Sequence, residues 1–118
     1  MTTMTHTPVD EETYSQLQEI MADEFAELIG LFTTDTEQCL ITLKQCVATQ
    51  DSPQVGALCH KLKSSSKLIG AFRLAEFAHL LEDYRENNDH QAAALHLSQL
   101  QAEYTQVLEW LKQQAIAV

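Results

Sequence analysis

The run CHKLKSSSKLIGAFRLAEFAHLLE, residues 59–82, contains two helical patterns separated by one glycine. Apolar residues recur at three- and four-residue steps on both sides of Gly70, as they do in helices that bury one face. Glycine readily adopts the left-handed conformation that ends many helices, so we expect the chain to turn at Gly70. The run therefore predicts two consecutive helices packed side by side.

The same spacing fills the rest of the chain. Asp10 is a candidate cap for a short first helix, and Asp23 is one for a long helix that ends near Thr49. Residues 51–53 (Asp-Ser-Pro) are typical of a helix start, and the turn-forming residues 87–89 precede a last long helix. Strand-like alternation is absent from the sequence. This pattern predicts an all-α fold, an antiparallel four-helix bundle with a short additional N-terminal helix.

Length and charge narrow the possible functions. A chain of 118 residues fits one domain, which we place at residues 9–118 after a flexible N-terminal tail at residues 1–8. The net charge of -10 argues against nucleic acid or an anionic membrane surface as a partner. Without a signal-like start or a long apolar stretch, a cytoplasmic protein is expected.

Neither cysteine nor histidine spacing predicts a metal site. The three cysteines, Cys39, Cys46 and Cys59, lack CxxC spacing and are expected to be small buried apolar residues. The histidines include no pair at the i,i+4 spacing of helical zinc sites. We therefore expect no bound metal.

One histidine lies in a locally cationic setting. On a helix, His60 shares a face with Lys63, Ser64 and Lys67, and this face is expected to point to solvent. Four of the seven basic residues of the chain fall close to His60: Lys61, Lys63, Lys67 and Arg73. An exposed imidazole is a nucleophile near neutral pH, which makes His60 a candidate phosphoryl acceptor.

Nearby side chains have the chemistry to assist such a reaction. Lys63, one turn after His60, could bind phosphoryl oxygens through charge-assisted hydrogen bonds, with Lys61 and Lys67 adding longer-range attraction. The second ring nitrogen of His60 must act as a donor so that the reactive nitrogen keeps its lone pair. Glu82, on the following helix, is the candidate acceptor for that proton.

These residues resemble the histidine-containing phosphotransfer (HPt) domain. Its motif runs His-x-Leu-Lys-Gly, then Gly-Ala, then a helix ending in Leu-Glu or a similar pair. The corresponding residues here are His60-Lys61-Leu62-Lys63, Gly70-Ala71 and Leu81-Glu82. Two positions depart from the pattern, because Ser64 replaces a glycine that gives a partner close access and Ala78 replaces a cysteine.

The resemblance implies a free-standing, monomeric phosphocarrier of a multistep two-component phosphorelay. His60 would accept a phosphoryl group from a receiver-domain aspartate of a hybrid sensor kinase and pass it to a response-regulator aspartate. The receiver would bring Mg²⁺, so no cofactor of its own is expected, and the sequence has no kinase or nucleotide motif. Partner docking would use apolar surface near His60, for which Leu17, Met21 and Leu68 are the candidates.

Two other functions are compatible with a helical bundle of this kind. The first is a non-catalytic adaptor that binds a receiver or kinase domain, which the presence of both His60 and Lys63 disfavours. The second is the dimerisation and phosphoacceptor segment of a histidine kinase. That segment normally has an acidic residue directly after its histidine and a proline soon after, whereas Lys61 follows here and residues 54–118 contain no proline.

Overall fold

The computed structural model describes residues 7–116, with side chains to residue 114, and these residues form helices without any strand. The elements are α1 (Glu11–Met21), the 3-10 turn η1 (Ala22–Glu24), α2 (Phe25–Ala48), α3 (Ser52–Ile69), α4 (Phe72–Glu82), α5 (Tyr84–Asn87) and α6 (His90–Ile116). The predicted all-α fold is confirmed. The predicted tail at 1–8 falls mostly outside the described residues, as do residues 117–118 of the predicted domain at 9–118.

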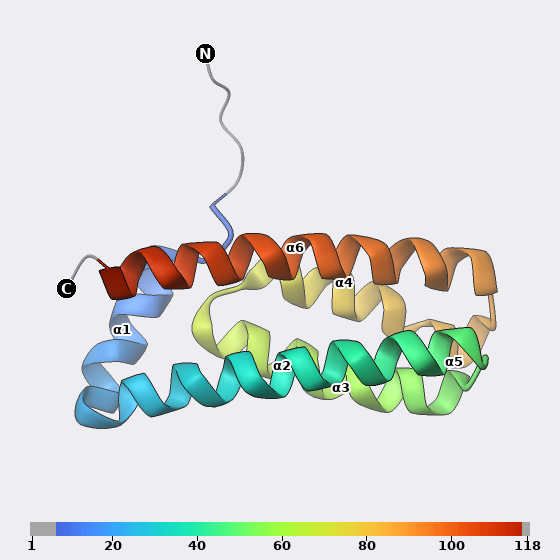
Figure 1. The fold of residues 1–118 in the computed structure, drawn as a ribbon, viewed down its shortest axis with the longest axis horizontal. Coiled ribbons are helices and arrows are strands. Elements are labelled where there is room, and N and C mark those ends of the chain that lie inside the picture. The colour runs from blue at the N-terminus through green and yellow to red at the C-terminus, as the bar shows by residue number, and fades with distance from the viewer. Residues whose placement is uncertain (1–6, 117–118) are drawn as a thin grey trace, which may run out of the picture.

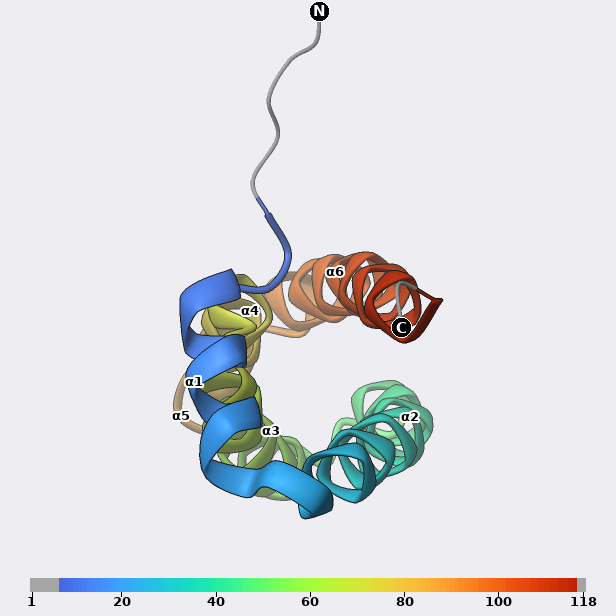
Figure 2. The ribbon, with the colours of Figure 1, turned by 90° about the vertical axis from the view of Figure 1, so that its left-hand side faces the viewer.

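Four helices lie along the long axis of the molecule, and consecutive ones run in opposite directions (Figure 1). They are α2, α3, α4 and α6, with the single turn of α5 extending α4 after a break at Asp83. The short α1 crosses one end of the bundle, against α3 (Figure 2). The four-helix bundle with an additional N-terminal helix is thus the observed architecture, and α3 packs most extensively against α4.

Side-chain caps begin α1 and α3 as the sequence predicts. The carboxylate of Asp10 accepts a hydrogen bond from the backbone N–H of Thr13 at 3.0 Å, and Asp51 accepts one from the N–H of Gln54 at 3.3 Å. Each bond satisfies a donor that the first turn of a helix leaves free. These caps fix where the two helices begin.

The predicted cap at Asp23 is wrong. Asp23 lies inside η1, and α2 begins at Phe25 after Glu24, without a side-chain cap. The reversal out of α1 is instead made at Ala22, which has a positive φ of 49°. This tight turn places Glu24 at the cap position of α2, so Asp23 lies one residue too early to be its cap.

Gly70 ends α3 in the left-handed conformation, with φ of 92°. The N–H of Ala71 returns to the carbonyl of Ser66 at 2.9 Å, which closes the last turn of the helix. The carbonyl of Gly70 also accepts a hydrogen bond from the N–H of Asp10 at 2.9 Å. The turn between α3 and α4 therefore also holds the start of α1.

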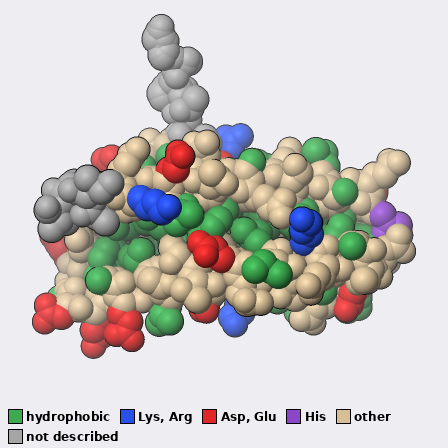
Figure 3. Space-filling model, viewed as in Figure 1, with side chains coloured by type: hydrophobic (Ala, Val, Ile, Leu, Met, Phe, Trp, Pro, Cys, Tyr) green, Lys and Arg blue, Asp and Glu red, His purple; other side chains and the backbone are tan. Residues whose placement is uncertain are grey.

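The core is one apolar cluster drawn from the facing sides of the long helices. Its larger members include Phe32, Leu40, Leu43, Val55, Leu62, Ile69, Leu74, Leu81, Tyr84, Leu97, Leu100, Tyr104, Val107 and Leu111. Leu58, Phe77 and Leu108 are only half-buried at its edge. Apolar side chains are visible along the seam between α2 and α6 (Figure 3). Tyr104 joins these two helices, since its hydroxyl donates to Glu37 at 2.9 Å.

Candidate functional site

His60 projects from the exposed side of α3, with 66% of its side-chain surface open to solvent. Its Nδ1 lies 3.1 Å from Oε2 of Glu82, which comes from the last turn of α4. Only 8% of the Glu82 side chain is exposed. The close packing of α3 on α4 thus joins an exposed imidazole to a buried carboxylate, the pair that the sequence predicted.

Lys63 occupies the other oxygen of the same carboxylate. Its Nζ donates to Oε1 of Glu82 at 2.8 Å, and its side chain is only 19% exposed. The expectation that Lys63 points to solvent with His60 is therefore wrong. The buried carboxylate draws the ammonium group across to α4, because a buried charge is costly without a partner of opposite sign.

Two further basic side chains lie near Glu82, and neither was among the predicted site residues. Arg85 on α5 donates from Nη2 to Oε2 at 3.3 Å, and His79 on α4 places Nδ1 at 3.9 Å from Oε1. Nζ of Lys63 also lies 3.5 Å from Nδ1 of His79. The available signal was the i,i+3 spacing of both residues from Glu82, which puts side chains on one helical face.

The protonation state of Glu82 follows from these contacts. Burial alone would raise its pKa, but hydrogen bonds and charge from Lys63 and His60 outweigh burial and lower the pKa below its ordinary value. The group is therefore a carboxylate at neutral pH and acts only as an acceptor.

The carboxylate determines which ring nitrogen of His60 can react. Because Oε2 only accepts, the hydrogen between the two groups belongs to Nδ1 of His60. In the neutral ring, Nε2 then carries the lone pair, on a side chain that is mostly exposed. The arrangement presents Nε2 to an incoming molecule and holds the negative charge of Glu82 behind the ring.

The remaining predicted residues on this face lie around His60 at different distances. Ser64 is exposed, and its hydroxyl donates weakly to the backbone carbonyl of His60 at 3.4 Å. Lys67 is exposed and lines a shallow depression between α3 and α4. The residues that line this depression are Thr7, Lys63, Lys67, Phe72, Arg73, Ala75, Glu76 and His79. The depression is cationic, because Lys63, Lys67 and Arg73 outnumber the single carboxylate of Glu76. Gly70 forms the turn between α3 and α4.

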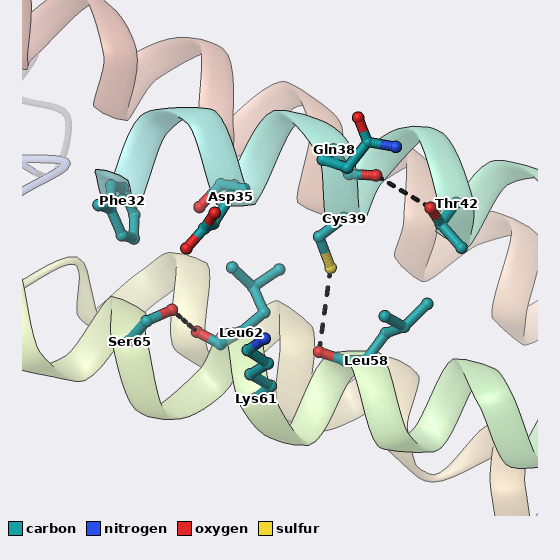
Figure 4. A pocket seen from close by; sticks show the side chains of 10 residues that line it. Phe32, Asp35, Gln38, Cys39, Thr42, Leu58, Lys61, Leu62 and Ser65 are labelled. Atoms are coloured by element: carbon teal, nitrogen blue, oxygen red, sulfur yellow. Dashed lines mark hydrogen bonds between the residues drawn. The ribbon is translucent and has the colours of Figure 1, made fainter. Parts of the chain in front are cut away.

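Lys61 is not brought into this cluster. Consecutive helical residues point about 100° apart, and Lys61 lies over a groove of about 240 Å³ between α2 and α3, near Asp35 and Cys39 (Figure 4). Burial raises the pKa of the Cys39 thiol to about 11, with Lys61 opposing that rise, and burial also raises the pKa of Cys59. These thiols are protonated at neutral pH and unreactive.

The three predicted docking residues differ in accessibility. Leu17 is half-buried and packs against the core, and Met21 is also half-buried, whereas Leu68 is half-exposed. Ile20 on α1 and Phe72 at the start of α4 are large apolar side chains that are at least half-exposed. Both were missed because periodicity does not distinguish a core position from an exposed apolar one at the edge of a helical face.

Two kinds of feature are absent from the described residues. Within residues 7–116, no helix is long and apolar enough to cross a membrane. The same part of the chain contains no group of three or more histidine, cysteine or acidic side chains placed to hold a metal ion.

Comparison with known proteins gives a consistent family match. The Hpt domain family matches residues 27–110. Histidine-containing phosphotransfer protein B from Pseudomonas aeruginosa is similar in structure, with a TM-score of 0.90, 26% identity, and coverage of 97% of this chain and 99% of that one. A histidine-containing phosphotransfer protein from Medicago truncatula has a TM-score of 0.80 and 26% identity, with coverage of 94% of this chain and 82% of that one. A histidine-containing phosphotransfer protein from maize has a TM-score of 0.75 and 24% identity, with coverage of 92% of this chain and 88% of that one. A search of curated proteins finds no match.

Proposed function

Because this chain belongs to the Hpt domain family, whose members are phosphocarriers of phosphorelays rather than kinases, we propose that His60 is the residue that carries the phosphoryl group. The observation that supports this most directly is the contact of 3.1 Å between Nδ1 of His60 and Oε2 of Glu82. It leaves Nε2 as the nucleophile on an exposed ring.

The proposed reaction balances without a separate acid or base. Nε2 of His60 attacks the phosphorus of an aspartyl phosphate, the phosphorus–oxygen bond breaks, and the aspartate leaves as a carboxylate. The proton on Nδ1 stays in place, so the ring becomes cationic and its charge faces Glu82. Lys63 holds Glu82 through one hydrogen and can direct others to phosphoryl oxygens.

The proposed partners are receiver domains. We propose that a hybrid sensor kinase donates the phosphoryl group from its receiver aspartate, that a response regulator accepts it, and that the receiver supplies the Mg²⁺. Lys67 and the adjoining cationic depression would attract the acidic receiver site, and Leu68 would add apolar contact. Ser64, beside His60, replaces the family glycine with a side chain small enough for a receiver to approach. We further propose a monomer that works in the cytoplasm and needs no cofactor of its own.

The test is phosphoryl uptake from a radiolabelled, phosphorylated receiver domain. The unaltered protein is expected to gain an acid-labile, base-stable label that His60→Gln lacks, whereas His96→Gln on α6 serves as the matched histidine control and keeps the label. Label that persists in His60→Gln would refute the assignment. Receiver binding without any uptake would instead identify the adaptor function.

A further inference from the structure

Gly56 lies one turn before His60 on α3, where it leaves space for the side chain of Arg85. A Cβ added at Gly56 would lie 2.8 Å from both Cβ and Cδ of Arg85 and 3.2 Å from its Nε. The backbone does not require glycine there, because among the described glycines only Gly70 has a positive φ. Glycine inside a helix costs about 1 kcal/mol relative to alanine, so the close approach of Arg85 is the structural reason for this residue.

The space at Gly56 lets Arg85 reach the site from α5. Nη2 of Arg85 lies 3.3 Å from Oε2 of Glu82, the same oxygen that faces Nδ1 of His60. Nε of Arg85 lies 3.4 Å from Oε2 of the exposed Glu86. The aliphatic part of the Arg85 side chain therefore packs against Gly56 on α3, and its guanidinium contacts the carboxylates of Glu82 and Glu86.

The two oxygens of Glu82 are thereby held separately. Lys63 donates to Oε1 at 2.8 Å, and Arg85 donates to Oε2. The last torsion of a glutamate side chain has a broad, weakly restricted energy profile, so a carboxylate held at one oxygen can still rotate. A second donor at the other oxygen restricts that rotation and fixes the direction from Oε2 to the imidazole.

We propose that Arg85, seated against Gly56, is a positioning residue for phosphotransfer: it fixes Oε2 of Glu82 so that His60 keeps its hydrogen on Nδ1 and its lone pair on Nε2. Arg85 acts through Glu82 and need not contact the phosphoryl group. This role rests on the proposed function of His60. It adds a third helix, α5, to the elements that orient the reactive ring.

Substitutions of Arg85 test the proposal in two independent measurements. Arg85→Ala is expected to slow phosphoryl uptake about three- to tenfold, the effect of losing one ordinary hydrogen bond. Nitrogen-15 NMR of the His60 ring should show a smaller fraction protonated at Nδ1. Arg85→Lys should retain part of both properties, and Arg85→Gln separates loss of charge from loss of a donor. Lys112→Ala on α6, which removes an exposed charge elsewhere, is the matched control.

Gly56→Ala tests whether the space at Gly56 is what places Arg85. The added methyl should displace Arg85 and slow uptake by a similar factor, but it should cause no further slowing in Arg85→Ala, because the contact with Glu82 is already lost. Gly30→Ala on α2 is the matched control, since an added Cβ there meets no atom within 4 Å. Circular dichroism and urea unfolding identify any variant that does not fold.

The outcomes separate this proposal from the proposed function. If Arg85→Ala and Arg85→Gln keep the uptake rate and the ring tautomer of the unaltered protein while His60→Gln takes no label, Arg85 has no positioning role. Equal slowing by Gly56→Ala with and without Arg85 would show that Gly56 acts independently of it. Label on His60→Gln would instead refute the assignment of His60.

Discussion

Removing the carboxylate of Glu82 is the sharpest test of how this site works. Glu82→Ala deletes the acceptor for Nδ1 of His60 and the partner of Lys63 and Arg85. Glu82→Gln keeps a neutral acceptor of the same length. The pair of variants therefore separates the value of an acceptor from the value of its negative charge.

The expected magnitudes follow from the contact between Nδ1 and Oε2, at 3.1 Å. A hydrogen bond to a charged group contributes about 1.5–3 kcal/mol and a neutral one about 0.5–1.5 kcal/mol. If the whole energy of the charged bond stabilises the ring as it becomes cationic during transfer, Glu82→Ala should slow uptake about 10- to 150-fold. Glu82→Gln loses only the difference between the two bonds, about 1–1.5 kcal/mol, so it should slow uptake about 5- to 13-fold.

The assay is a single turnover with excess labelled receiver phosphate, quenched at short times. Receiver concentration is varied so that the rate of transfer is measured apart from binding. Glu109→Ala, which removes an exposed carboxylate on α6, is the control and should transfer at the unaltered rate. Transfer by folded Glu82→Ala at the rate of the unaltered protein would show that the carboxylate does not assist the ring.

Three further predictions follow from the same structure. Lys63→Ala should slow transfer about tenfold and lower the free energy of unfolding by about 1–3 kcal/mol, because the buried carboxylate of Glu82 loses its shortest donor. Unchanged rapid-quench rates and urea midpoints would contradict this. Gly70→Ala should lower the free energy of unfolding by at least about 1–2 kcal/mol, since its φ is 92° and a Cβ would lie 3.0 Å from the Asp10 carbonyl oxygen; urea unfolding beside Gly30→Ala measures it. The lowered pKa of Glu82 means that its stabilising contribution is present above the pKa of the unfolded carboxyl group and is lost as pH falls through the lower folded value. Glu82→Gln should therefore weaken the loss of stability below about pH 5 in a urea series, and identical pH profiles for the two proteins would refute this account.

Much of the fold could be predicted because its signals are local. Apolar spacing indicates the helices, and Asp10, Asp51 and Gly70 mark helix ends through bonds or dihedral angles that involve only near neighbours. The turn between α1 and α2 could not be predicted in the same way. Whether Asp23 caps α2 depends on the angle at which α1 arrives, and α1 is placed by the contact between Asp10 and Gly70 at the far side of the bundle end.

In the candidate site, too, some contacts could be predicted from the sequence and others could not. The pairing of His60 with Glu82 could be predicted, because the two residues lie on consecutive helices joined by a short turn. The turn of the Lys63 side chain toward Glu82 could not be predicted, because a long side chain follows its strongest partner rather than the helical face on which it starts. Arg85 was missed although it lies three residues after Glu82, because its approach to Gly56 joins two helices and becomes visible only in the folded structure.

The side chains that contact the Glu82 carboxylate are His60, Lys63, His79 and Arg85. Among the described residues they all belong to one continuous helical hairpin, α3 to α5. The contacts of the candidate site and much of the outer surface therefore come from separate stretches of the sequence. Substitutions on the exposed sides of α1 and α2 leave the contacts of Glu82 with His60, Lys63 and Arg85 in place. Copies of such a chain can therefore differ widely on those faces and keep the same arrangement around the ring.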